Sequence, residues 1–360
     1  MVDKPLLSVR DLQTYFMADE GTVKAVDGVS FDVYPGQTLG IVGESGCGKS
    51  VTAHSILRVV EEPGRIVGGQ ILLRRTQGGR DAQRLNGSGE QKELDLVTLS
   101  PNGRMMRSIR TGVIAYIFQE PMSAFSPVHT IGNQIREAIQ FHRSVSKREA
   151  HARGIELLRR VGIPRAEQRM DEYAFQLSGG LRQRALIAMA LSCDPELLIA
   201  DEPTTALDVT TQAQILELLA DLQEQNGMAI MLITHNLGVV AEMADDVVVM
   251  YLGHVVEEGP VDEIFYAPKH PYTQLLLKSI PSVYSESRTK LPTIAGSVPH
   301  PYSRPKGCPF HPRCPSFLRG TCDVYEPQLL AVEGSQRVSC FLYEPLAVRS
   351  QRSGDVSRES

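Results

Sequence analysis

The sequence predicts an α/β fold in which helices cover both faces of a buried sheet. From Leu6 to about Tyr284, short runs of Val, Ile and Leu alternate with longer helix-compatible stretches, which is the pattern of an α/β domain. Several of the runs are apolar at consecutive positions, as expected for strands that are covered on both faces. The candidate strands are Thr38–Val42, Val113–Phe118, Leu197–Ala200, Ala229–Ile233 and Val247–Tyr251.

Three segments depart from this alternation. Residues 74–104 are dominated by Gly, Gln, Arg, Asn and Ser, which provide little for a core, so we expect a partly flexible surface insertion. After Ile280 the chain becomes Pro-rich and loses its periodicity, and we place a small irregular extension at 285–348. The polar end, 349–360, is expected to be disordered. One large domain over 6–284 therefore precedes the extension.

Composition limits the classes of function. The chain has 360 residues, of which 42% are hydrophobic and 22% charged, ordinary values for a globular protein. No run approaches the roughly 18 apolar residues of a membrane span, and the start, MVDKPLLSVRDLQTYF, has acidic residues where a signal peptide would be apolar. Any membrane role is therefore expected to be peripheral. The net charge of -5 argues against nucleic-acid binding, which normally needs a basic face.

A phosphate-binding loop is predicted directly after the first candidate strand. The segment GESGCGKS follows the apolar run LGIV and precedes the helix-compatible VTAHSILR, as the pattern G-x-x-x-x-G-K-[ST] requires. Its glycines let backbone N–H groups surround a polyphosphate, Lys49 reaches the β and γ phosphates, and Ser50 binds Mg²⁺. The alternative is a chance Gly-rich turn. The residues predicted to contact nucleotide are Gly43, Glu44, Ser45, Gly46, Cys47, Gly48, Lys49, Ser50 and Val51.

Two carboxylates end another candidate strand. The segment LLIADE closes with Asp201 and Glu202, an arrangement that supports Mg²⁺ and polarises a water beside a nucleotide. Asp201 is the candidate on the metal side. Glu202 is placed to act as the general base on the attacking water. A surface Asp-Glu pair is the alternative.

Further motifs resemble those of ATP-binding-cassette ATPases. LSGG at Leu177–Gly180 is similar to their signature, and ALD at Ala206–Asp208 is similar to their dimer-contact loop. His235 after LLIT resembles the switch histidine, and Gln119 in YIFQEP resembles the glutamine that links nucleotide to the transmembrane partner. The resemblance implies a RecA-like core, a helical subdomain over about 120–190 and an antiparallel β subdomain.

The resemblance also implies roles for these residues. Ser178, Gly179 and Gly180 precede a helix-compatible run, so their N–H groups and its dipole can cap the γ-phosphate of a nucleotide held by the other subunit. Asp208 belongs to the contact between the two subunits. Catalytic roles fall to Glu202, Lys49 and His235, with His235 contacting the γ-phosphate; Gln119 ligates Mg²⁺. Either Phe16 or Tyr15 stacks on adenine, and Phe16 is preferred by its position in the family pattern; a core role is the alternative.

Within this class, further segments resemble those of the ATPase subunits of bacterial oligopeptide and dipeptide importers. These segments are EPMSAFSPVHTIGNQI, YLGHVVEEGP, HPYTQLLLKSIP and GCPFHPRCP. Four cysteines, separated by five, seven and seventeen residues, lie in the extension. They could supply four thiolates to a metal centre, [4Fe-4S] by resemblance to some members, with zinc or no metal as alternatives. These cysteines are Cys308, Cys314, Cys322 and Cys340, and His311 is a possible substitute ligand.

The resulting hypothesis is an ATP-hydrolysing subunit that powers peptide import, peripheral on the cytoplasmic face of the cell membrane. Its implied partners are two transmembrane permease subunits, a second and related ATPase chain and, indirectly, an extracytoplasmic substrate-binding protein, but no nucleic acid. Nickel or oligosaccharide import is the first alternative. A soluble cassette ATPase acting on nucleic acid or ribosomes is less favoured, because the chain has one cassette and no sustained heptads. A regulatory subunit that hardly hydrolyses ATP is disfavoured by the presence of Glu202 and His235.

Overall fold

An eight-stranded sheet forms the centre of the molecule in the computed structural model, which describes residues 4–74, 93–205, 207–279 and 294–344. The strand order is β11-β12-β10-β9-β3-β8-β7-β6, and the five strands from β9 to β6 run parallel. They are β9 (Asp246–Tyr251), β3 (Thr38–Val42), β8 (Ala229–Thr234), β7 (Leu197–Asp201) and β6 (Ile114–Ile117). They coincide with the five candidate strands, which confirms that prediction.

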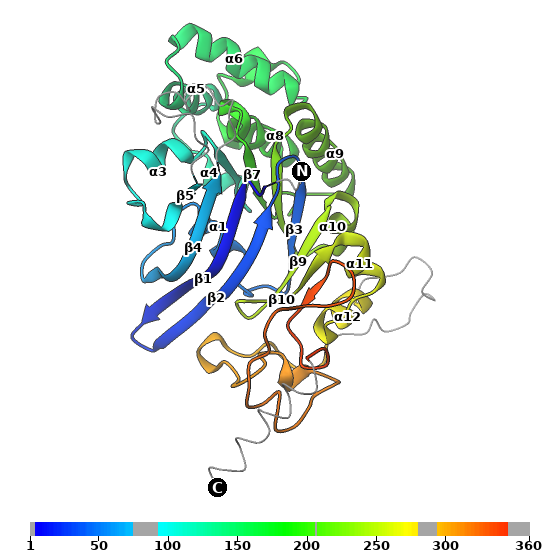
Figure 1. Ribbon diagram of the computed structural model, residues 1–360. Helices are drawn as coiled ribbons and strands as arrows, with labels where there is room; N and C mark the ends of the chain where they lie inside the picture. Colours follow the sequence, from blue (N-terminus) through cyan, green and yellow to red (C-terminus); the bar gives the residue numbers. More distant parts are fainter. Residues whose placement is uncertain (1–3, 75–92, 206, 280–293, 345–360) are drawn as a thin grey trace.

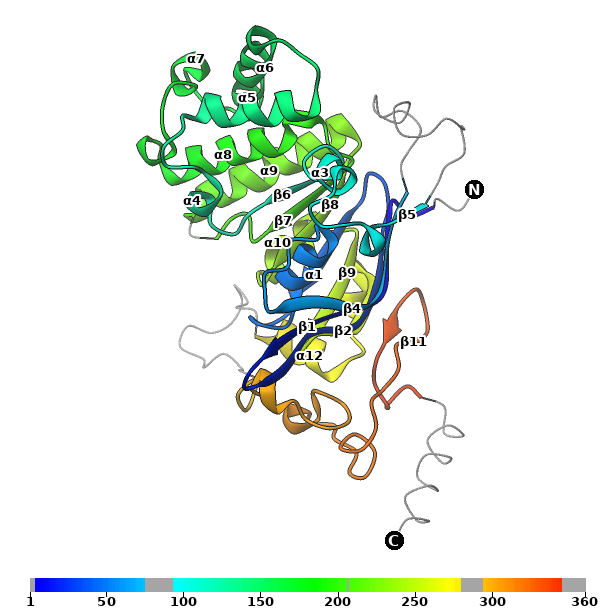
Figure 2. The same ribbon diagram turned by 90° about the vertical axis from the view of Figure 1, so that its left-hand side faces the viewer.

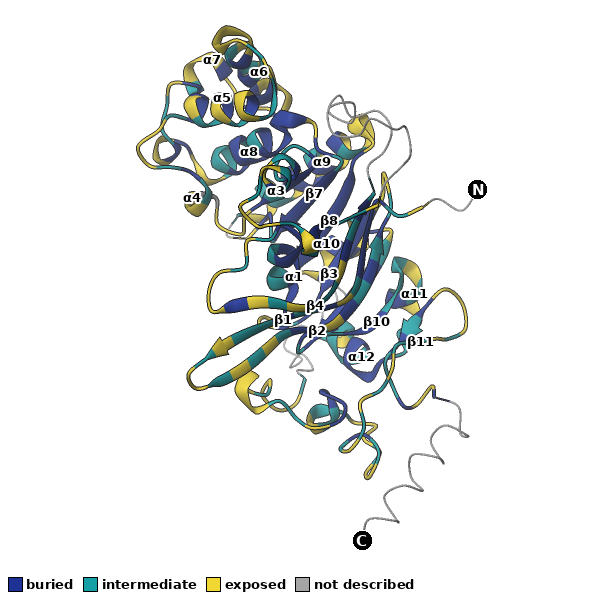
Figure 3. Ribbon diagram, turned by 60° about the vertical axis from the view of Figure 1, so that its left-hand side comes forward, coloured by how far each residue is buried: buried dark blue, intermediate teal, exposed yellow. Residues whose placement is uncertain are grey.

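The parallel strands are buried because helices lie against both faces of the sheet. Every residue of β3, β7 and β8 is buried, and Figure 3 shows β7 and β8 as unbroken buried ribbons inside the molecule. The covering helices include α1 (Lys49–Ile56), α9 (Val209–Asn226) and α10 (Leu237–Met243). Val, Ile and Leu on consecutive positions thus meet apolar partners on each side, as the sequence pattern requires.

A second, antiparallel sheet covers α1 from the other side. Its order is β2-β1-β4-β5, formed by β2 (Gly21–Val33), β1 (Leu7–Ala18), β4 (Gly64–Arg74) and β5 (Glu93–Asp95). Leu7, Phe31, Ile41 and Ile56 belong to one buried cluster that joins the two sheets. A buried polar pair, Thr14 Oγ1 of β1 and Ser55 Oγ of α1, lies 2.8 Å apart and joins this sheet to the helix.

The helical lobe stands to one side of the strands (Figure 2). It consists of α4 (Pro121–Ala124), α5 (Ile131–His142), α6 (Lys147–Arg160), α7 (Ala166–Arg169), the 3-10 turn η2 (Ala174–Gln176) and α8 (Gly179–Ala190). Local sequence sets its helix starts: Thr130 caps α5, and Ser146 with Glu149 forms a capping box on α6. Ile135, Ile139 and Leu158 are buried in the core that the lobe shares with β7 and β8.

The expected surface insertion is more ordered than its composition suggested. Residues 75–92 lie outside the described part of the chain, but Glu93–Asp95 pairs with β4 as strand β5. Leu96, in the 3-10 turn η1 (Leu96–Thr98), is fully buried, and α3 (Arg104–Ile109) follows. The prediction that this segment adds little to a core was therefore wrong for its last twelve positions, because Leu94, Val97 and Leu99 also pack against the core around Leu96.

The extension also has more regular structure than expected. After β10 (His254–Pro260), α11 (Val261–Tyr266) and α12 (Pro271–Lys278), the chain forms η4 (Pro301–Ser303) and η5 (His311–Arg313). Strands β11 (Leu330–Ala331) and β12 (Arg337–Val338) then join the central sheet through β10. Phe310, Val338 and Phe341 are buried. The polar end, 349–360, lies outside the described residues.

The described helices are all too short or too polar to cross a bilayer.

Candidate nucleotide-binding site

The predicted phosphate loop joins β3 to α1 in a backbone path that only glycine permits at two positions. Gly43 and Gly48 have φ values of +154° and +102°. A Cβ atom at Gly43 would lie 2.2 Å from the carbonyl oxygen of Met250, and one at Gly48 would lie 2.3 Å from that of Ala25. The loop is therefore pressed against neighbouring backbone, and glycine is needed for space as well as for conformation.

Lys49 begins α1 and its side chain folds back over the loop. Its Nζ atom donates hydrogen bonds to the carbonyl oxygens of Gly43 (2.8 Å) and Glu44 (3.2 Å), and the residue is only 6% exposed. The ammonium thus lies where the loop surrounds it, near the N-terminal end of α1. Ser50 is half-buried beside it, whereas Ser45 and Gly46 are exposed at the tip of the loop.

The remaining predicted members of the loop support its shape. Val51 packs against the core cluster that joins the two sheets. Cys47 is buried, and burial raises the pKa of its thiol, an effect that Lys49 opposes. A protonated, enclosed thiol packs as a small apolar side chain, which agrees with an incidental role for this cysteine.

Asp201, at the end of β7, has one carboxylate oxygen without a partner. Its Oδ2 accepts a hydrogen bond from the Tyr116 hydroxyl at 2.8 Å. Its Oδ1 is buried and has no hydrogen-bond partner among the described residues, and the residue is only 2% exposed. A buried, unpaired carboxylate oxygen is costly unless something binds it, so Asp201 fits a role in binding a hydrated Mg²⁺.

Glu202 is the centre of a cluster of polar side chains. Oε2 accepts hydrogen bonds from Gln119 Nε2 (3.0 Å) and Thr205 Oγ1 (2.9 Å), and Oε1 lies 2.9 Å from His235 Nδ1. The structure thus brings together three predicted residues, Glu202, His235 and Gln119, from three loops at the carboxyl ends of β7, β8 and β6. Glu202 has a φ of +46°, a left-handed conformation that is strained for this residue type and typical of functional sites.

The environment keeps the Glu202 carboxyl ionised. Burial raises its pKa, but hydrogen bonds from His235 and Thr205 and the charge of Lys49 outweigh burial, so that the pKa lies below the usual value. An ionised carboxylate next to solvent can accept a proton from water. His235 is 62% exposed in its side chain, so it can also reach a group outside the chain.

The two aromatic candidates near the N-terminus differ in their surroundings. Tyr15 donates its hydroxyl proton to Asp27 (2.6 Å) and lies under the Lys24 ammonium, so both its hydroxyl and its ring already have partners within the chain. Phe16 is half-buried and makes no polar contact; a Cβ at Gly64 would lie 2.7 Å from its ring. Thr14, two residues before Phe16, points at α1, but the register of β1 with β2 shifts between Thr14 and Tyr15, so strand alternation does not fix the direction of the Phe16 ring.

The signature and dimer-contact residues lie apart from this cluster. Ser178 caps α8 by accepting a hydrogen bond from Leu181 N–H, and Asp208 caps α9 through Thr211. Ser178, Gly179 and Asp208 are exposed; Ala206 lies outside the described residues. Across the described ranges, no hydrogen bond or ion pair joins any of these residues to Lys49, Asp201 or Glu202.

The four cysteines of the extension receive no support as a metal centre. Cys308 and Cys322 are buried, while Cys314 and Cys340 are half-buried. In the part of the chain that the structure describes, no three His, Cys, Asp or Glu side chains are arranged to hold a metal ion. Burial, with a contribution from the other cysteines, raises the pKa of Cys308 to about 12. The expectation of a [4Fe-4S] or zinc site is therefore not supported: four thiols in one segment do not by themselves produce a ligand geometry.

His311 is not part of a three-ligand group among the described residues. Its Nδ1 atom lies 3.0 Å from the carbonyl oxygen of Cys308, so one ring nitrogen is engaged with local backbone in η5. This contact supports the turn that positions the next residues of the extension.

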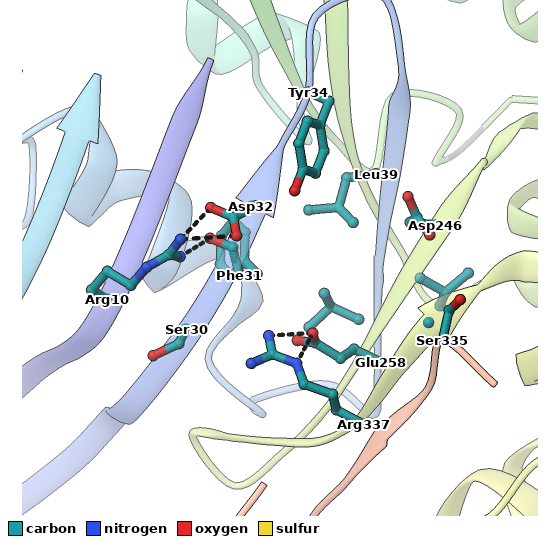
Figure 4. Close-up of a pocket in the computed structure, with 13 residues that line it drawn as sticks. Arg10, Ser30, Phe31, Asp32, Tyr34, Leu39, Asp246, Glu258, Ser335 and Arg337 are labelled. Atoms are coloured by element: carbon teal, nitrogen blue, oxygen red, sulfur yellow. Dashed lines mark hydrogen bonds and ion pairs between the residues drawn. The ribbon is translucent and has the colours of Figure 1, made fainter. Parts of the chain in front are cut away.

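A separate hollow of about 530 Å³ opens between the two sheets, where β2 faces β9 and β10. Figure 4 shows that two ion pairs line it, Arg10 with Asp32 and Arg337 with Glu258. None of the predicted site residues lies there. Four of its charged side chains form these two pairs and Asp246 adds a further carboxylate, so among the described residues the hollow offers no unpaired positive charge for phosphate and does not compete with the phosphate loop as the candidate nucleotide site.

The fold and the loop define the class of the protein. A parallel sheet with a phosphate loop after β3 and an acidic strand end on β7 is the architecture of a P-loop ATPase. Solved structures with the same fold include the dimeric structure of MJ0796, a bacterial ABC transporter cassette, at a TM-score of 0.59 and 24% identity over 71% of this chain and 98% of that one. A second is cbiO1 from Clostridium perfringens, part of the ABC transporter complex cbiONQ, at a TM-score of 0.56 and 25% identity over 74% and 92%.

Sequence comparisons give the family. Residues 26–205 match the ABC transporter family, and residues 256–322 match the oligopeptide/dipeptide transporter, C-terminal region. The chain is 48% identical to the oligopeptide transport ATP-binding protein AppD of Bacillus subtilis over 94% of its own length and 97% of that protein. The chain belongs to the ABC transporter family, as an ATPase subunit.

Several side chains at the site were not found from the sequence. Tyr116 holds Asp201, Thr205 holds Glu202, and Arg313 with Tyr272 contacts Glu44 of the phosphate loop. A tyrosine within the apolar run of β6 was an available signal, because a buried hydroxyl needs a partner. Nothing local to Arg313 indicates its contact, since 269 residues separate it from Glu44.

Proposed function

We propose that this chain is the ATP-hydrolysing subunit that powers the import of dipeptides or oligopeptides across the cell membrane. Residues 6–284 form the ATPase domain and 285–348 the extension typical of that class. The observation that carries the proposal is the match of 256–322 to the oligopeptide/dipeptide transporter C-terminal region. The near full-length similarity to a protein named for oligopeptide transport supports it.

The proposed nucleotide site uses the phosphate loop and the hairpin of β1 and β2. Backbone N–H groups of Gly43–Ser50 surround the phosphates, and Lys49 leaves its two carbonyl partners to bind them. Phe16 stacks on the adenine. Mg²⁺, when bound, would neutralise charge on the phosphates. Ser50, Gln119 and Asp201 are the residues placed to hold it, Asp201 through its unpaired Oδ1.

Hydrolysis then depends on Glu202. Its ionised carboxylate accepts a proton from water, whose oxygen attacks the γ-phosphorus as the bond to the bridging oxygen breaks, giving ADP and phosphate. His235, which shares a hydrogen bond with Glu202 in this structure, orients that carboxylate and contacts the γ-phosphate. Because Gln119 also bonds Glu202, the glutamine can report the state of the catalytic carboxylate to a partner that contacts its loop.

A second ATPase chain completes the site in this proposal. Ser178, Gly179 and Gly180 present the N-terminus of the 12-residue helix α8. Ser178 and Gly179 are exposed and Gly180 is half-buried, so the segment is suited to cap a phosphate held by another subunit. Asp208 lies in the same contact. Two transmembrane permeases bind near Gln119, a substrate-binding protein acts through them, and the chain resides on the cytoplasmic face of the membrane.

The test is uptake by cells in which this chain is deleted and then restored. Restoration with the unaltered chain should recover accumulation of labelled dipeptides and oligopeptides, while Glu202→Gln should not. Accumulation of nickel and of oligosaccharides is measured in the same strains. Peptide uptake that survives deletion, with a loss of nickel or oligosaccharide uptake, would transfer the proposal to those substrates.

A further inference from the structure

The phosphate loop is held from outside by the extension. Arg313, in η5, donates two hydrogen bonds to the Glu44 carboxylate, from Nη1 to Oε2 (2.6 Å) and from Nη2 to Oε1 (3.0 Å). The Arg313 side chain is 4% exposed and that of Glu44 is 25% exposed. A two-point contact between a guanidinium and a carboxylate fixes orientation as well as distance.

Arg313 is itself fixed in place. Nη1 also approaches the Tyr251 hydroxyl at 3.3 Å, and Nε donates to the carbonyl oxygen of Ala295 at 3.2 Å. The hydrogen bond to Glu44 is the main reason that the pKa of Arg313 is raised. Phe310, three residues earlier, packs its ring edge against Tyr251 and Tyr272. The end of η5 is therefore anchored to β9 and α12.

A second contact reaches the backbone of the same loop residue. The N–H of Glu44 donates to the hydroxyl of Tyr272 at 2.9 Å. Tyr272 is fully buried at the start of α12. The backbone N–H of Tyr272 donates a hydrogen bond to His270 Nδ1 at 3.0 Å, and the backbone N–H of His270 donates one to the Glu257 carboxylate. Tyr272 is thus presented to the loop by a helix start whose own groups are paired.

Three different groups of Glu44 are therefore held by three residues. Tyr272 holds its N–H, Arg313 holds its carboxylate, and Lys49 holds its carbonyl oxygen. Lys49 must leave the carbonyl when it binds a phosphate. Arg313 and Tyr272 are then the side chains that keep this end of the loop in shape, while Ser45 and Gly46 beside it are exposed.

We propose that Arg313 is a positioning residue for ATP binding, through which the extension holds the phosphate loop in its binding shape by way of Glu44. The proposal rests on the assignment of this loop to ATP. A loop that is already shaped loses less conformational entropy when it closes around a ligand. Loss of Arg313 should thus weaken ATP binding while leaving the chemical step, which depends on Glu202 and His235, unaltered.

The test measures MgATP binding by the full chain, and KM and kcat for ATP in the assembled transporter. Arg313→Ala is expected to raise Kd and KM about tenfold, the effect of losing a charge-assisted hydrogen bond, with kcat within twofold. Arg313→Lys keeps the positive charge but cannot make the two-point contact with the carboxylate, so its KM should lie between those of Arg313→Ala and the unaltered chain. Arg319→Ala, an exposed arginine in the same extension, is the matched control and should change neither constant.

A double-mutant cycle separates this role from a general loss of structure. Glu44→Gln weakens the same pair from the loop side without altering the extension. If Arg313 acts through Glu44, the double variant should have a KM no higher than that of the more affected single variant. Additive increases, a KM that Glu44→Gln leaves unchanged, or a fall in kcat with unchanged KM would overturn the proposal.

Lys49→Ala distinguishes failure of this inference from failure of the ATP assignment. If Lys49→Ala abolishes MgATP binding while Arg313→Ala leaves Kd unchanged, the ATP site stands and the positioning role is wrong. If Lys49→Ala itself binds MgATP normally, the loop is not the nucleotide site and both assignments fall.

Discussion

The phosphate loop and the signature segment are both glycine-containing turns that open a helix, yet their surroundings differ. The loop is enclosed by its own chain: Met250 and Ala25 press on its glycines, and Lys49 and Arg313 bind its groups. The signature residues Ser178 and Gly179 are exposed, with a local cap as their main polar contact. The phosphate loop is thus enclosed within this chain, whereas the signature segment faces solvent.

This difference supports the proposal that each ATP site uses the phosphate loop of one chain and the signature segment of another. The enclosed loop is shaped to bind nucleotide before any partner arrives, whereas the outward signature has use only when another surface approaches it. Binding by the separate chain and turnover by the assembled transporter should therefore respond to different residues. Four predictions test this division, from the largest expected effect to the smallest.

Glu202→Gln should produce the largest difference between ATP binding by the separate chain and ATP turnover by the assembled transporter. The amide cannot accept the proton of the attacking water, so ATP turnover should fall by about 10²–10⁴-fold, while the Kd for MgATP changes little. Turnover by the assembled transporter and binding by the separate chain are the measurements. Glu224→Gln, on an exposed glutamate of α9, is the control. Unchanged turnover in Glu202→Gln would remove the glutamate from the chemistry.

Ser178→Asp should affect only the assembled transporter. Aspartate caps a helix as well as serine does, but its charge repels a phosphate approaching α8, so turnover should fall about 10- to 100-fold. The separate chain should bind MgATP with the same Kd. Ser178→Asn has the same shape and cap without the charge and should retain most turnover. A raised Kd in the separate Ser178→Asp chain would contradict the division between enclosed and outward sites.

Tyr116→Phe should have a smaller effect, which is on the stability of the separate chain around Asp201. It removes the hydrogen bond to Asp201 Oδ2 and leaves a second buried carboxylate oxygen unpaired, which should lower the free energy of unfolding by about 1–3 kcal/mol. Denaturant unfolding of the separate chain measures the change. The control is Tyr266→Phe, because Tyr266 is exposed. Equal stability of the two variants would show that the Tyr116 hydroxyl does not support Asp201.

Thr205→Val should produce the smallest effect, a change in pH dependence. The pKa of Glu202 is held below its usual value partly by the Thr205 hydroxyl, so the base is present above that pKa and is lost as pH falls through it. Without the hydroxyl the pKa rises, and the acidic limb of kcat should move to higher pH. Kcat is measured across the range in which the transporter stays folded, with Thr22→Val, on an exposed position of β2, as control. An acidic limb of kcat at the same pH in Thr205→Val and the unaltered chain would mean that Thr205 does not lower the pKa of Glu202.

Contiguous motifs explain what the sequence could predict. The strand, glycine loop and helix around Lys49 follow one another along the chain, and Asp201 with Glu202 ends an apolar run, so local pattern is sufficient. The five parallel strands were found for the same reason, because burial on both faces leaves unbroken apolar runs.

Contacts between distant segments explain what it could not. Tyr116 and Arg313 gain their roles only when β6 meets β7 and when the extension meets the loop, and spacing along the chain contains no trace of either. The four cysteines show the converse: they are close in sequence and contribute to raising the pKa of Cys308 and Cys314, yet no three ligand side chains among the described residues are arranged to hold a metal ion. Leu96 was missed because the Gly-, Gln- and Ser-rich residues before it dominated the composition of the segment, although Leu94, Val97 and Leu99 beside it also pack against the core.

The contact between Arg313 and Glu44 has a consequence for the order in which the protein is made. Because the two residues are 269 positions apart, the ribosome completes the loop, the antiparallel sheet, the helical lobe and every strand of the central sheet except β11 and β12 before it synthesises the arginine. Domains begin to fold from the N-terminus during synthesis, so the nascent phosphate loop forms without this anchor. It acquires the anchor only when η5 has emerged and packed against α12 and β9; Figure 1 shows the orange part of the extension next to α12 in the finished fold.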